Sequence, residues 1–512
     1  MFNIMNFLGI KDRLKSLYIV EFALILIGII IRLKWYIINQ SFFCDECSLG
    51  FNIVTRNYLE LFLPLNVSQC APPFFLVISK FILDMSHQYG NLYTQDLTLR
   101  LFPLICSIIS LPLFAIFLNK ITNNKMYIWI CLAILSLNHC AIEYSVVFKQ
   151  YSCELMFALI LLLTFFHFDI NKLTKKNSII YSIIFCISIW FSSTAIILLA
   201  TGLLYLIFKS FSKEYRNNLK EKLSNLCIIG ISFLINAILY YFCFLKGQYN
   251  SEVYVFMQFF WTQAEPGFFT LGNFLTLFPQ RLYYLIEIAN FPMNLLVPFL
   301  LLNIVLFIKS NFDLKTKFFV IIPILLSIIA SFLNLYPFQR KFILFLLPLY
   351  TILYTQILYL IKPNKFFKIL TILVIIYCSY MKFINPSLHP YYTTQPVRKM
   401  IEYIVQNKIP ANKTIFASQE HVDYYLNSIY TLDEPLLHDI PWAGFETSKV
   451  PELLKQSPKG DYYIFTPFSN ISDKYNKGLI KYLNEDKHLK ILKTYSYFAY
   501  KEWVYIIHFE KK

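Results

Sequence analysis

Long apolar runs separated by short, lysine-bearing loops are the feature that most restricts how this chain can fold. A helix needs about 20 mainly apolar residues to cross a bilayer. The pattern predicts about eleven spans, at residues 18–38, 99–118, 127–142, 153–168, 179–191, 193–208, 226–245, 285–308, 318–335, 341–361 and 367–383. The runs 179–191 and 193–208 nearly abut, so they form either a tight hairpin or one bent span. The run 72–83 is short enough for an interfacial or re-entrant helix.

The composition also indicates a polytopic membrane protein. Of the 512 residues, 57% are hydrophobic and 15% are charged, whereas soluble domains carry about 25% charged residues. The net charge of +16 would suit a nucleic acid, but the lysines lie in short loops between apolar runs, as they do in cytoplasmic loops of membrane proteins. We therefore expect contact with membrane lipid and no nucleic-acid partner.

Six clusters of basic residues predict which way the chain lies in the membrane. They occur at residues 11–15, 120–125, 172–176, 209–222, 309–317 and 362–368. All six fall on one side when the abutting runs count as two spans, and the positive-inside rule makes that side cytoplasmic. The predicted location is a cytoplasmic (inner) cell membrane. The acid pair at residues 45–46, the segment around Glu143, the loop 246–284, the segment 336–340 and the tail then share the extracytoplasmic side.

The tail differs in composition from the rest of the chain. From about residue 386 onward it is richer in polar and charged residues. Helical spacing occurs over 397–406 and 420–426, and strand-like segments occur at 414–417, 462–466 and 495–509. We predict a transmembrane catalytic domain at residues 1–385 and a small extracytoplasmic α/β domain at 386–512. The tail contains no G-x-G-x-x-G or P-loop pattern, so no nucleotide site is indicated.

Asp45 and Glu46 are adjacent carboxylates that closely follow the first predicted span. Ionisable groups beside a bilayer are costly to hold and are often functional. A carboxylate in a cleft at the membrane surface can act as a general base, with its pKa raised by partial burial. The alternative is a pair of solvated loop acids, and the two residues alone leave both interpretations open.

A second polar cluster interrupts an apolar stretch at residues 143–154. Lys149, Tyr151 and Glu154 lie within about a turn and a half of each other, so the start of a helix could direct them into one cavity. The functional interpretation is contact with a lipid phosphate or a sugar. The alternative is a structural Lys149–Glu154 ion pair.

Three more cations lie at predicted outer ends of spans. Arg340 and Lys341 follow a proline, and a guanidinium suits phosphate through its two-pronged geometry; interfacial snorkelling is the alternative. Arg100 begins the second span and either neutralises the acid pair or, as we favour, pairs locally with Asp96. The aromatic loop 246–284 suits an interfacial helix or a lid, and His139 suits a buried structural role.

Cys44 and Cys47 flank the acid pair as C-x-x-C. Redox or metal chemistry would need further ligands, and the sequence supplies no second pair or histidine cluster. We therefore expect no metal and no cofactor. A disulfide from Cys70 to Cys44 or Cys47 stays open.

Five motifs occur in an order typical of one enzyme family. They are R-L followed by F-x-D-E (32–46), Q-x-A-P-P-F-F (69–75), L-R-L-F-P-L (99–104), Y-S-x-x-x-K-Q-Y-S-x-E (144–154) and Y-P-F followed by Arg340. The chain resembles the GT-C polytopic glycosyltransferases of the family 39 type, the protein O-mannosyltransferases and the aminoarabinose transferases of lipid A. The resemblance covers residues 32–361, and the tail resembles the extracytoplasmic domain that often follows.

The resemblance implies transfer of a sugar from a polyprenyl-phosphate carrier to an acceptor protein, lipid or glycan polymer at the outer face. Asp45 would deprotonate the acceptor, Glu46 would complete the acid motif, and Glu154 would bind a sugar. Lys149 and Arg340 would hold the carrier phosphate, and no metal is implied. The usual Trp before D-E is replaced by Phe43-Cys44, and K-x-P-P by residues 70–73, which leaves the substrate open.

Two other classes of function compete with a glycosyltransferase. A transporter or lipid flippase would place ionisable groups at the bilayer midplane and would show internal repeats, neither of which the sequence contains. A non-catalytic envelope scaffold would tolerate loss of the acid pair.

Overall fold

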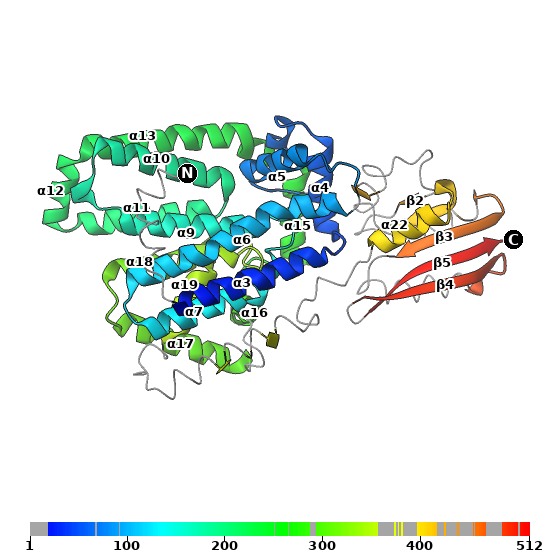
Figure 1. The fold of residues 1–512 in the computed structure, drawn as a ribbon. Coiled ribbons are helices and arrows are strands. Elements are labelled where there is room, and N and C mark those ends of the chain that lie inside the picture. Colours follow the sequence, from blue (N-terminus) through cyan, green and yellow to red (C-terminus); the bar gives the residue numbers. More distant parts are fainter. Residues whose placement is uncertain are drawn as a thin grey trace.

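The computed structural model describes residues 19–66, 69–91, 93–249, 251–264, 266–286, 293–356, 397–416, 456–466, 484–499 and 502–512, with short pieces at 373–374, 377, 380–381, 424–425, 438–439 and 454. A long helical part lies beside a small sheet formed by the tail (Figure 1). This agrees with the predicted class, a mainly α-helical protein with apolar helices and a small C-terminal α/β unit.

The helical part is built from many helices of uneven length. The α-helices are α3 (Ile19–Ile38), α4 (Cys44–Thr55), α5 (Pro73–Ser86), α6 (Thr94–Ile121), α7 (Lys125–Leu137), α8 (His139–Glu143), α9 (Tyr151–His167), α10 (Lys175–Phe191), α11 (Ala195–Ser210), α12 (Lys213–Glu221), α13 (Leu223–Tyr240), α14 (Lys246–Tyr249), α15 (Glu252–Phe259), α16 (Phe274–Ile286), α17 (Met293–Lys309), α18 (Leu314–Phe332) and α19 (Leu347–Tyr354). Two π-helices, η3 (Tyr241–Leu245) and η4 (Phe260–Ala264), and three 3-10 helices, η1 (Glu60–Phe62), η2 (Ile170–Lys172) and η5 (Leu344–Leu346), join them.

Within the described ranges, three helices are long and apolar enough to cross a membrane: Thr94–Ile121, Leu223–Tyr249 and Leu314–Phe332. Several other predicted spans correspond to apolar helices of 10–17 residues, so the number of spans stays a prediction. The runs 179–191 and 193–208 form two separate helices, because α10 ends at Phe191 and α11 begins at Ala195. The last predicted span, 367–383, lies almost entirely outside the described residues.

One predicted span has the wrong boundaries. The run 127–142 is divided at Asn138, whose side chain accepts a hydrogen bond from the Ala141 N–H at 2.9 Å and so caps a new helix, α8. The run 285–308 includes the end of α16 and most of α17 from Met293 onward, but the residues 287–292 between these helices lie outside the described ranges.

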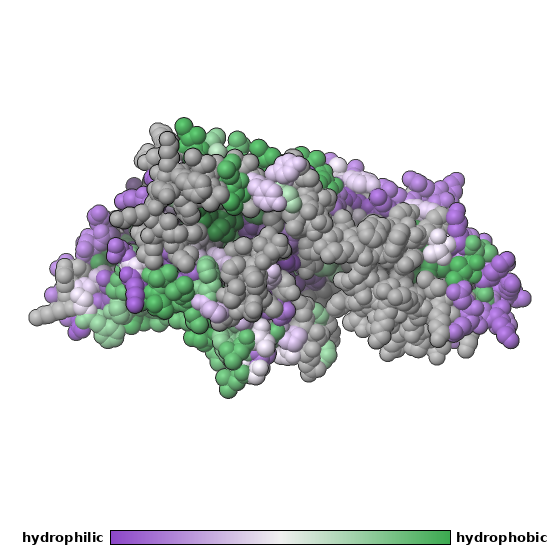
Figure 2. Space-filling model, turned by 90° about the horizontal axis from the view of Figure 1, so that it is seen from below, coloured by the Kyte–Doolittle hydropathy of each residue, from purple (hydrophilic) through white to green (hydrophobic). Residues whose placement is uncertain are grey.

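The surface of α13 indicates an apolar environment. Only 11% of the most apolar 18-residue stretch of the helical segment Leu223–Tyr249, which begins with α13, is buried within the protein, and Ile231, Leu234 and Ile235 are exposed. Figure 2 shows broad hydrophobic areas over the helical part, whereas hydrophilic residues gather at the sheet end. Apolar surface of this extent is rare on soluble monomers, so lipid is the environment that these helices fit.

Arg32 fixes the helix that leads into the acid pair. It is fully buried on α3, and its guanidinium donates to Ser107 Oγ on α6 at 2.8 Å and to the Ser136 carbonyl on α7 at 2.9 Å. A buried guanidinium in an apolar bundle must find its acceptors inside the protein. These bonds therefore lock α3 against α6 and α7, and with it the chain entering residues 39–46.

The described part of the tail carries an α-helix, α22 (Val397–Gln406), a 3-10 helix, η8 (Ala411–Lys413), and a five-stranded sheet. The strands are β1 (Thr414–Phe416), β2 (His438–Asp439), β3 (Gly460–Thr466), β4 (Leu489–Ala499) and β5 (Glu502–Lys511) in the order β2-β1-β3-β5-β4. Strand β1 runs parallel to β2 and β3, and β5 runs antiparallel to β3 and β4. The helix predicted at 397–406 and the strands near 414 and 462 are confirmed, and the segment 495–509 is a hairpin.

Candidate active site

Asp45 and Glu46 lie in the first turn of α4, which begins directly after the extended residue Phe43. The free N–H groups at a helix start favour negative charge. The two side chains nevertheless have opposite surroundings, since the Glu46 side chain is 2% exposed and the Asp45 side chain is 36% exposed.

Two lysines from distant segments surround Asp45. Lys341 Nζ donates to Asp45 Oδ2 at 3.5 Å, and Lys149 interacts with Asp45 through its charge. Burial raises the pKa of Asp45, but the two ammonium charges and the Lys341 hydrogen bond together lower it further, so the pKa lies below its ordinary value. The raised pKa expected from the sequence is therefore wrong, and Asp45 is a carboxylate at neutral pH.

Glu46 is enclosed by donors. Arg100 Nε donates to Oε1 at 2.8 Å and Arg100 Nη2 to Oε2 at 2.7 Å. The backbone N–H groups of Phe43 and Phe148 add bonds at 3.3 Å and 2.6 Å. Of the two partners proposed for Arg100 from the sequence, the acid pair is the correct one. The favoured local pair is wrong, because Asp96 points to the tail and pairs with Arg398 instead.

Six of the eight predicted site residues line one small cavity of about 40 Å³. They are Asp45, Glu46, Arg100, Lys149, Tyr151 and Lys341, together with Glu143. The space is enough for a water molecule or a hydroxyl group. The cavity thus brings the acid pair, the segment around residue 149 and the start of the tenth predicted span into one place.

Lys149 lies in the turn between α8 and α9, and Tyr151 is the first residue of α9. The Lys149 ammonium donates to Gln69 Oε1 rather than forming the Lys149–Glu154 ion pair considered from the sequence. Burial lowers the pKa of Lys149 and the Lys341 charge adds to this, while Asp45 acts in the opposite direction. The Tyr151 ring is buried edge-on against Tyr144, with ring centroids 5.0 Å apart.

Arg340 lies beside the small cavity and not on its lining. Its Nη2 is 3.3 Å from Glu143 Oε2, and Glu143 also lies 3.6 Å from His139 Nε2. His139 is buried, as expected. Lys341 is covered by the aromatic loop, because its Nζ lies 5.3 Å from the centroid of the buried Trp261 ring. The part of the loop around Trp261 therefore packs over this edge of the site.

Glu154 connects the site to a second, much larger cavity. It lies one turn beyond Tyr151 on α9 and is 3% exposed. Its carboxylate interacts electrostatically with Tyr240 and Tyr336, which line the large cavity. It also interacts with Cys70, which in turn senses the charge of Lys149. Glu154 therefore lies between the polar site and the part of the large cavity that Tyr240 and Tyr336 line.

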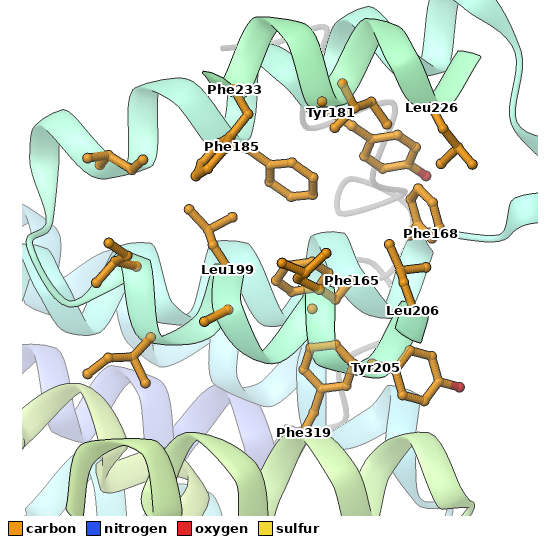
Figure 3. Close-up of a pocket in the computed structure, with 18 of the residues that line it drawn as sticks. Phe165, Phe168, Tyr181, Phe185, Leu199, Tyr205, Leu206, Leu226, Phe233 and Phe319 are labelled. Atoms are coloured by element: carbon orange, nitrogen blue, oxygen red, sulfur yellow. The ribbon is translucent and has the colours of Figure 1, made fainter. Parts of the chain in front are cut away.

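The large cavity has a volume of about 1370 Å³ and is mainly apolar. Figure 3 shows Phe185 from α10 and Phe233 from α13 facing Phe165 from α9 and Leu199 from α11 across it. Lys209 and Lys315 line the end farthest from Tyr240 and Tyr336. The cavity therefore runs along much of the helix length, as a groove for a long apolar chain would.

The cysteines near the acid pair are thiols. Cys44, Cys47 and Cys70 form no disulfide in the structure. In the part of the chain that the structure describes, no three His, Cys, Asp or Glu side chains gather as a metal site.

Sequence reasoning missed several residues around the site. Gln69 and Trp261 contact the predicted lysines, and Arg398, Tyr424 and Tyr425 reach the acid-pair segment from the tail. Gln69 lies inside the Q-x-A-P-P-F-F motif, which was a usable signal. The sequence around Tyr424 and Tyr425 contains no such signal, because no local pattern indicates that a side chain will contact another domain.

Comparisons with known proteins return structures but no sequence relatives. No protein-family model and no curated protein matches the chain. Two crystal structures of ArnT from Cupriavidus metallidurans are similar in fold, each at 9% identity. The one bound to undecaprenyl phosphate has a TM-score of 0.48 and covers 95% of this chain and 97% of its own. The apo structure has a TM-score of 0.49 and covers 94% and 97%.

ArnT is an aminoarabinose lipid A transferase of the GT-C class. At this identity and TM-score, function has to be argued from the residues of this chain.

Proposed function

We propose that this chain is a membrane glycosyltransferase that moves a sugar from a polyprenyl-phosphate carrier to an acceptor. The observation that carries the proposal is the Asp45 carboxylate, held by two lysine charges in a small polar cavity, together with a long apolar cavity whose tyrosines interact with Glu154. Such a site combines a base, cations for a phosphate and a groove for a lipid chain. The extracytoplasmic placement and the inner membrane belong to the same proposal.

In the proposed reaction, Asp45 accepts the proton of an acceptor hydroxyl in the small cavity. The acceptor oxygen then forms a bond to the anomeric carbon of the sugar while the bond from that carbon to the phosphate oxygen breaks. The phosphate leaves with the electron pair as polyprenyl phosphate, and attack from the opposite face inverts the anomeric carbon. A carboxylate serves this step only when ionised, which the low pKa of Asp45 ensures.

The cations stabilise the charge that develops on the leaving phosphate. Lys149 is 6% exposed, and its charge acts on Cys70, which also interacts with Glu154. Arg340 keeps 16% of its side chain exposed while paired with Glu143. Fixed cations at a site shielded from water contribute most where charge appears in the transition state. Glu154, which interacts with Tyr240 and Tyr336 of the large cavity, would bind a sugar hydroxyl in this proposal.

We assign Glu46 a supporting role within this proposal. Its carboxylate oxygens already accept four hydrogen bonds from Arg100, Phe43 and Phe148. A carboxylate so occupied has little capacity left for a proton from substrate. Glu46 and Arg100 instead fix the start of α4 against α6.

The test is replacement of Asp45 in the full chain. In a host that lacks the gene, complementation with the parent restores an envelope glycan detectable by mass spectrometry. The Asp45→Asn variant should give about 10²- to 10⁴-fold less product, with normal membrane insertion. Asp461→Asn, which removes an exposed acid of the tail, is the matched control and should restore the glycan fully.

Two outcomes would contradict the proposal. Parental glycan levels with Asp45→Asn would exclude Asp45 as the base. Movement of labelled polyprenyl-phosphate sugar across proteoliposomes without any transfer product would favour the flippase alternative.

A further inference from the structure

The Asp96 carboxylate is a buried charge that the proposed reaction does not use. It lies in the first turn of α6, fully buried and one helical turn before Arg100. The hydroxyls of Tyr424 and Tyr425 donate to its two oxygens at 2.9 Å and 2.7 Å, and Arg398 Nε lies 3.7 Å away. The tyrosines come from the tail, 328 and 329 positions later in the chain.

The same tail residues hold the segment that leads into the acid pair. The Tyr425 hydroxyl accepts the Phe42 N–H at 2.7 Å while donating to Asp96. The Arg398 N–H donates to Ser41 Oγ at 3.2 Å, and its guanidinium donates to the Asn39 carbonyl. Residues 39–42 are thus bound to the tail immediately before Asp45.

A stack of aromatic rings connects the tail to the acid-pair segment and to the segment before Lys149. The Tyr424 ring stacks on Phe42 with centroids 5.1 Å apart, and Phe42 stacks on Phe148 at 6.0 Å. Phe148 precedes Lys149, so this aromatic stack links the acid-pair segment to the segment that contains Lys149. On the other side, a Cβ on Gly50 of α4 would lie 2.7 Å from the Tyr424 ring, so only glycine permits this approach.

We propose that Asp96, Arg398, Tyr424 and Tyr425 form a tail clamp that positions Asp45 against Lys149 and Lys341. They are positioning residues, since none of them lines the small cavity. The inference deepens the proposed function and rests on it for what is positioned. In this proposal the tail holds the catalytic residues in place, in addition to any role in covering the site or binding the acceptor.

Burial explains why this contact is well suited to fixing a geometry. A buried carboxylate is costly unless every partner is in place, and an unpaired buried N–H costs a comparable amount. The Tyr425 hydroxyl serves both Asp96 and the Phe42 N–H, so only one arrangement satisfies all three groups. If the tail shifted, the Asp96 carboxylate and the Phe42 N–H would both lose the Tyr425 hydroxyl while still buried. At the protein surface, water would replace the lost hydrogen bonds.

The test compares Tyr425→Phe with Tyr462→Phe in the full-length protein. Each variant removes one hydroxyl from a fully buried tail tyrosine, but the Tyr462 hydroxyl donates to Pro458 within the tail. Tyr425→Phe should lower kcat about 10- to 100-fold, because small displacements of a catalytic group cost this much. The KM for the polyprenyl-phosphate sugar should change less than kcat, because none of the four clamp residues lines the large apolar cavity. Tyr462→Phe should change neither.

A second readout does not depend on activity. Peptide-resolved alkylation of Cys44, next to Asp45, should be several-fold faster in Tyr425→Phe than in the parent, with the exposed Cys70 as internal reference. Gly50→Ala displaces the Tyr424 ring from α4 and should likewise lower kcat and speed the alkylation of Cys44. It replaces Tyr425→Phe in the experiment if that variant does not fold.

Parental kcat and parental Cys44 labelling in either folded variant would overturn the clamp. A fall in thermal stability alone, without the split between kcat and KM, would also overturn it, because that result indicates a merely structural contact. If the parent transfers no sugar, the proposed function fails, and Cys44 labelling still decides whether the tail positions this segment.

Discussion

Two polar regions lie side by side at the start of α4, and they differ in how completely their charges are enclosed. In the open region, Asp45 keeps 36% of its side chain exposed and meets Lys341 at 3.5 Å. In the sealed region, Glu46 and Asp96 are at most 2% exposed, and their nearest donors lie 2.6 to 2.9 Å away. The two regions meet at the peptide bond between Asp45 and Glu46.

The difference teaches that neighbouring carboxylates in one motif need not share a role. A catalytic base needs access to substrate and a proton affinity that it can use, which the open region provides. A carboxylate that holds two segments together needs full satisfaction of its oxygens, which the sealed region provides. The sealed region fixes the geometry, and the open region is left free for chemistry.

The largest effect is expected when the sealed region loses a charge. Glu46→Gln leaves the buried Arg100 guanidinium without its counter-charge, and breaking one partner of a buried pair costs about 3 to 5 kcal/mol. We expect a large fall in the melting temperature of the purified protein, measured at a fixed scan rate.

Asp45→Asn is the matched comparison for this measurement. It removes the neighbouring charge from the open region, where solvent screens the pairing, so its melting temperature should stay close to that of the parent. Equal destabilisation by the two variants would show that the distinction between sealed and open regions is wrong.

A smaller and pH-dependent effect is expected in the open region from Lys341→Met. Removing this cation lets the pKa of Asp45 rise toward its ordinary value. In the proposed reaction Asp45 acts as a carboxylate, so the acid limb of the kcat/KM profile should move to higher pH, with a larger loss of activity at about pH 4 than at about pH 8. The same pairing stabilises the folded chain above the ordinary pKa of Asp, and this contribution is lost as the pH falls through the lowered value.

Lys246→Met is the control for that profile. Lys246 is an exposed lysine on α14 that lies over the Phe242 ring and does not line the small cavity. Its replacement should leave the acid limb in place. An acid limb that stays fixed in Lys341→Met would remove Lys341 from the environment of Asp45.

The sequence predicted the members of the site better than their pairing. Hydrophobic runs and loop charges bring Asp45, Lys149 and Lys341 to one face, and all three line one cavity. Topology alone is enough for such a grouping, because it depends only on which spans end together. The helix at 397–406 was also predictable, since its apolar positions recur with helical spacing.

The partners of each charge could not be predicted from local sequence. Asp96 precedes Arg100 by one turn, so helical spacing favoured a local pair, yet Arg100 donates to Glu46 and Asp96 accepts from the tail. The pKa of Asp45 was misjudged for the same reason, because its sign depends on two lysines about 100 and 300 positions away. Long-range pairing is decided by packing, which no local pattern contains.

The smallest effect is expected from filling the large cavity, which adjoins the open region through Glu154 and leaves the sealed region untouched. Leu199→Trp places an indole among the apolar residues of Figure 3. If it displaces one or two methylene groups of a bound isoprenoid chain, at about 0.8 kcal/mol each, KM for a full-length carrier should rise roughly four- to fifteenfold. The variant should use a carrier with only one or two isoprene units as well as the parent does.

Leu204→Trp is the control for this prediction. Leu204 lies on the same helix but is 40% exposed and off the cavity lining, so its replacement should affect neither carrier. Equal increases for long and short carriers would mean that the indole acts on the polar site, and that the cavity does not hold the lipid chain.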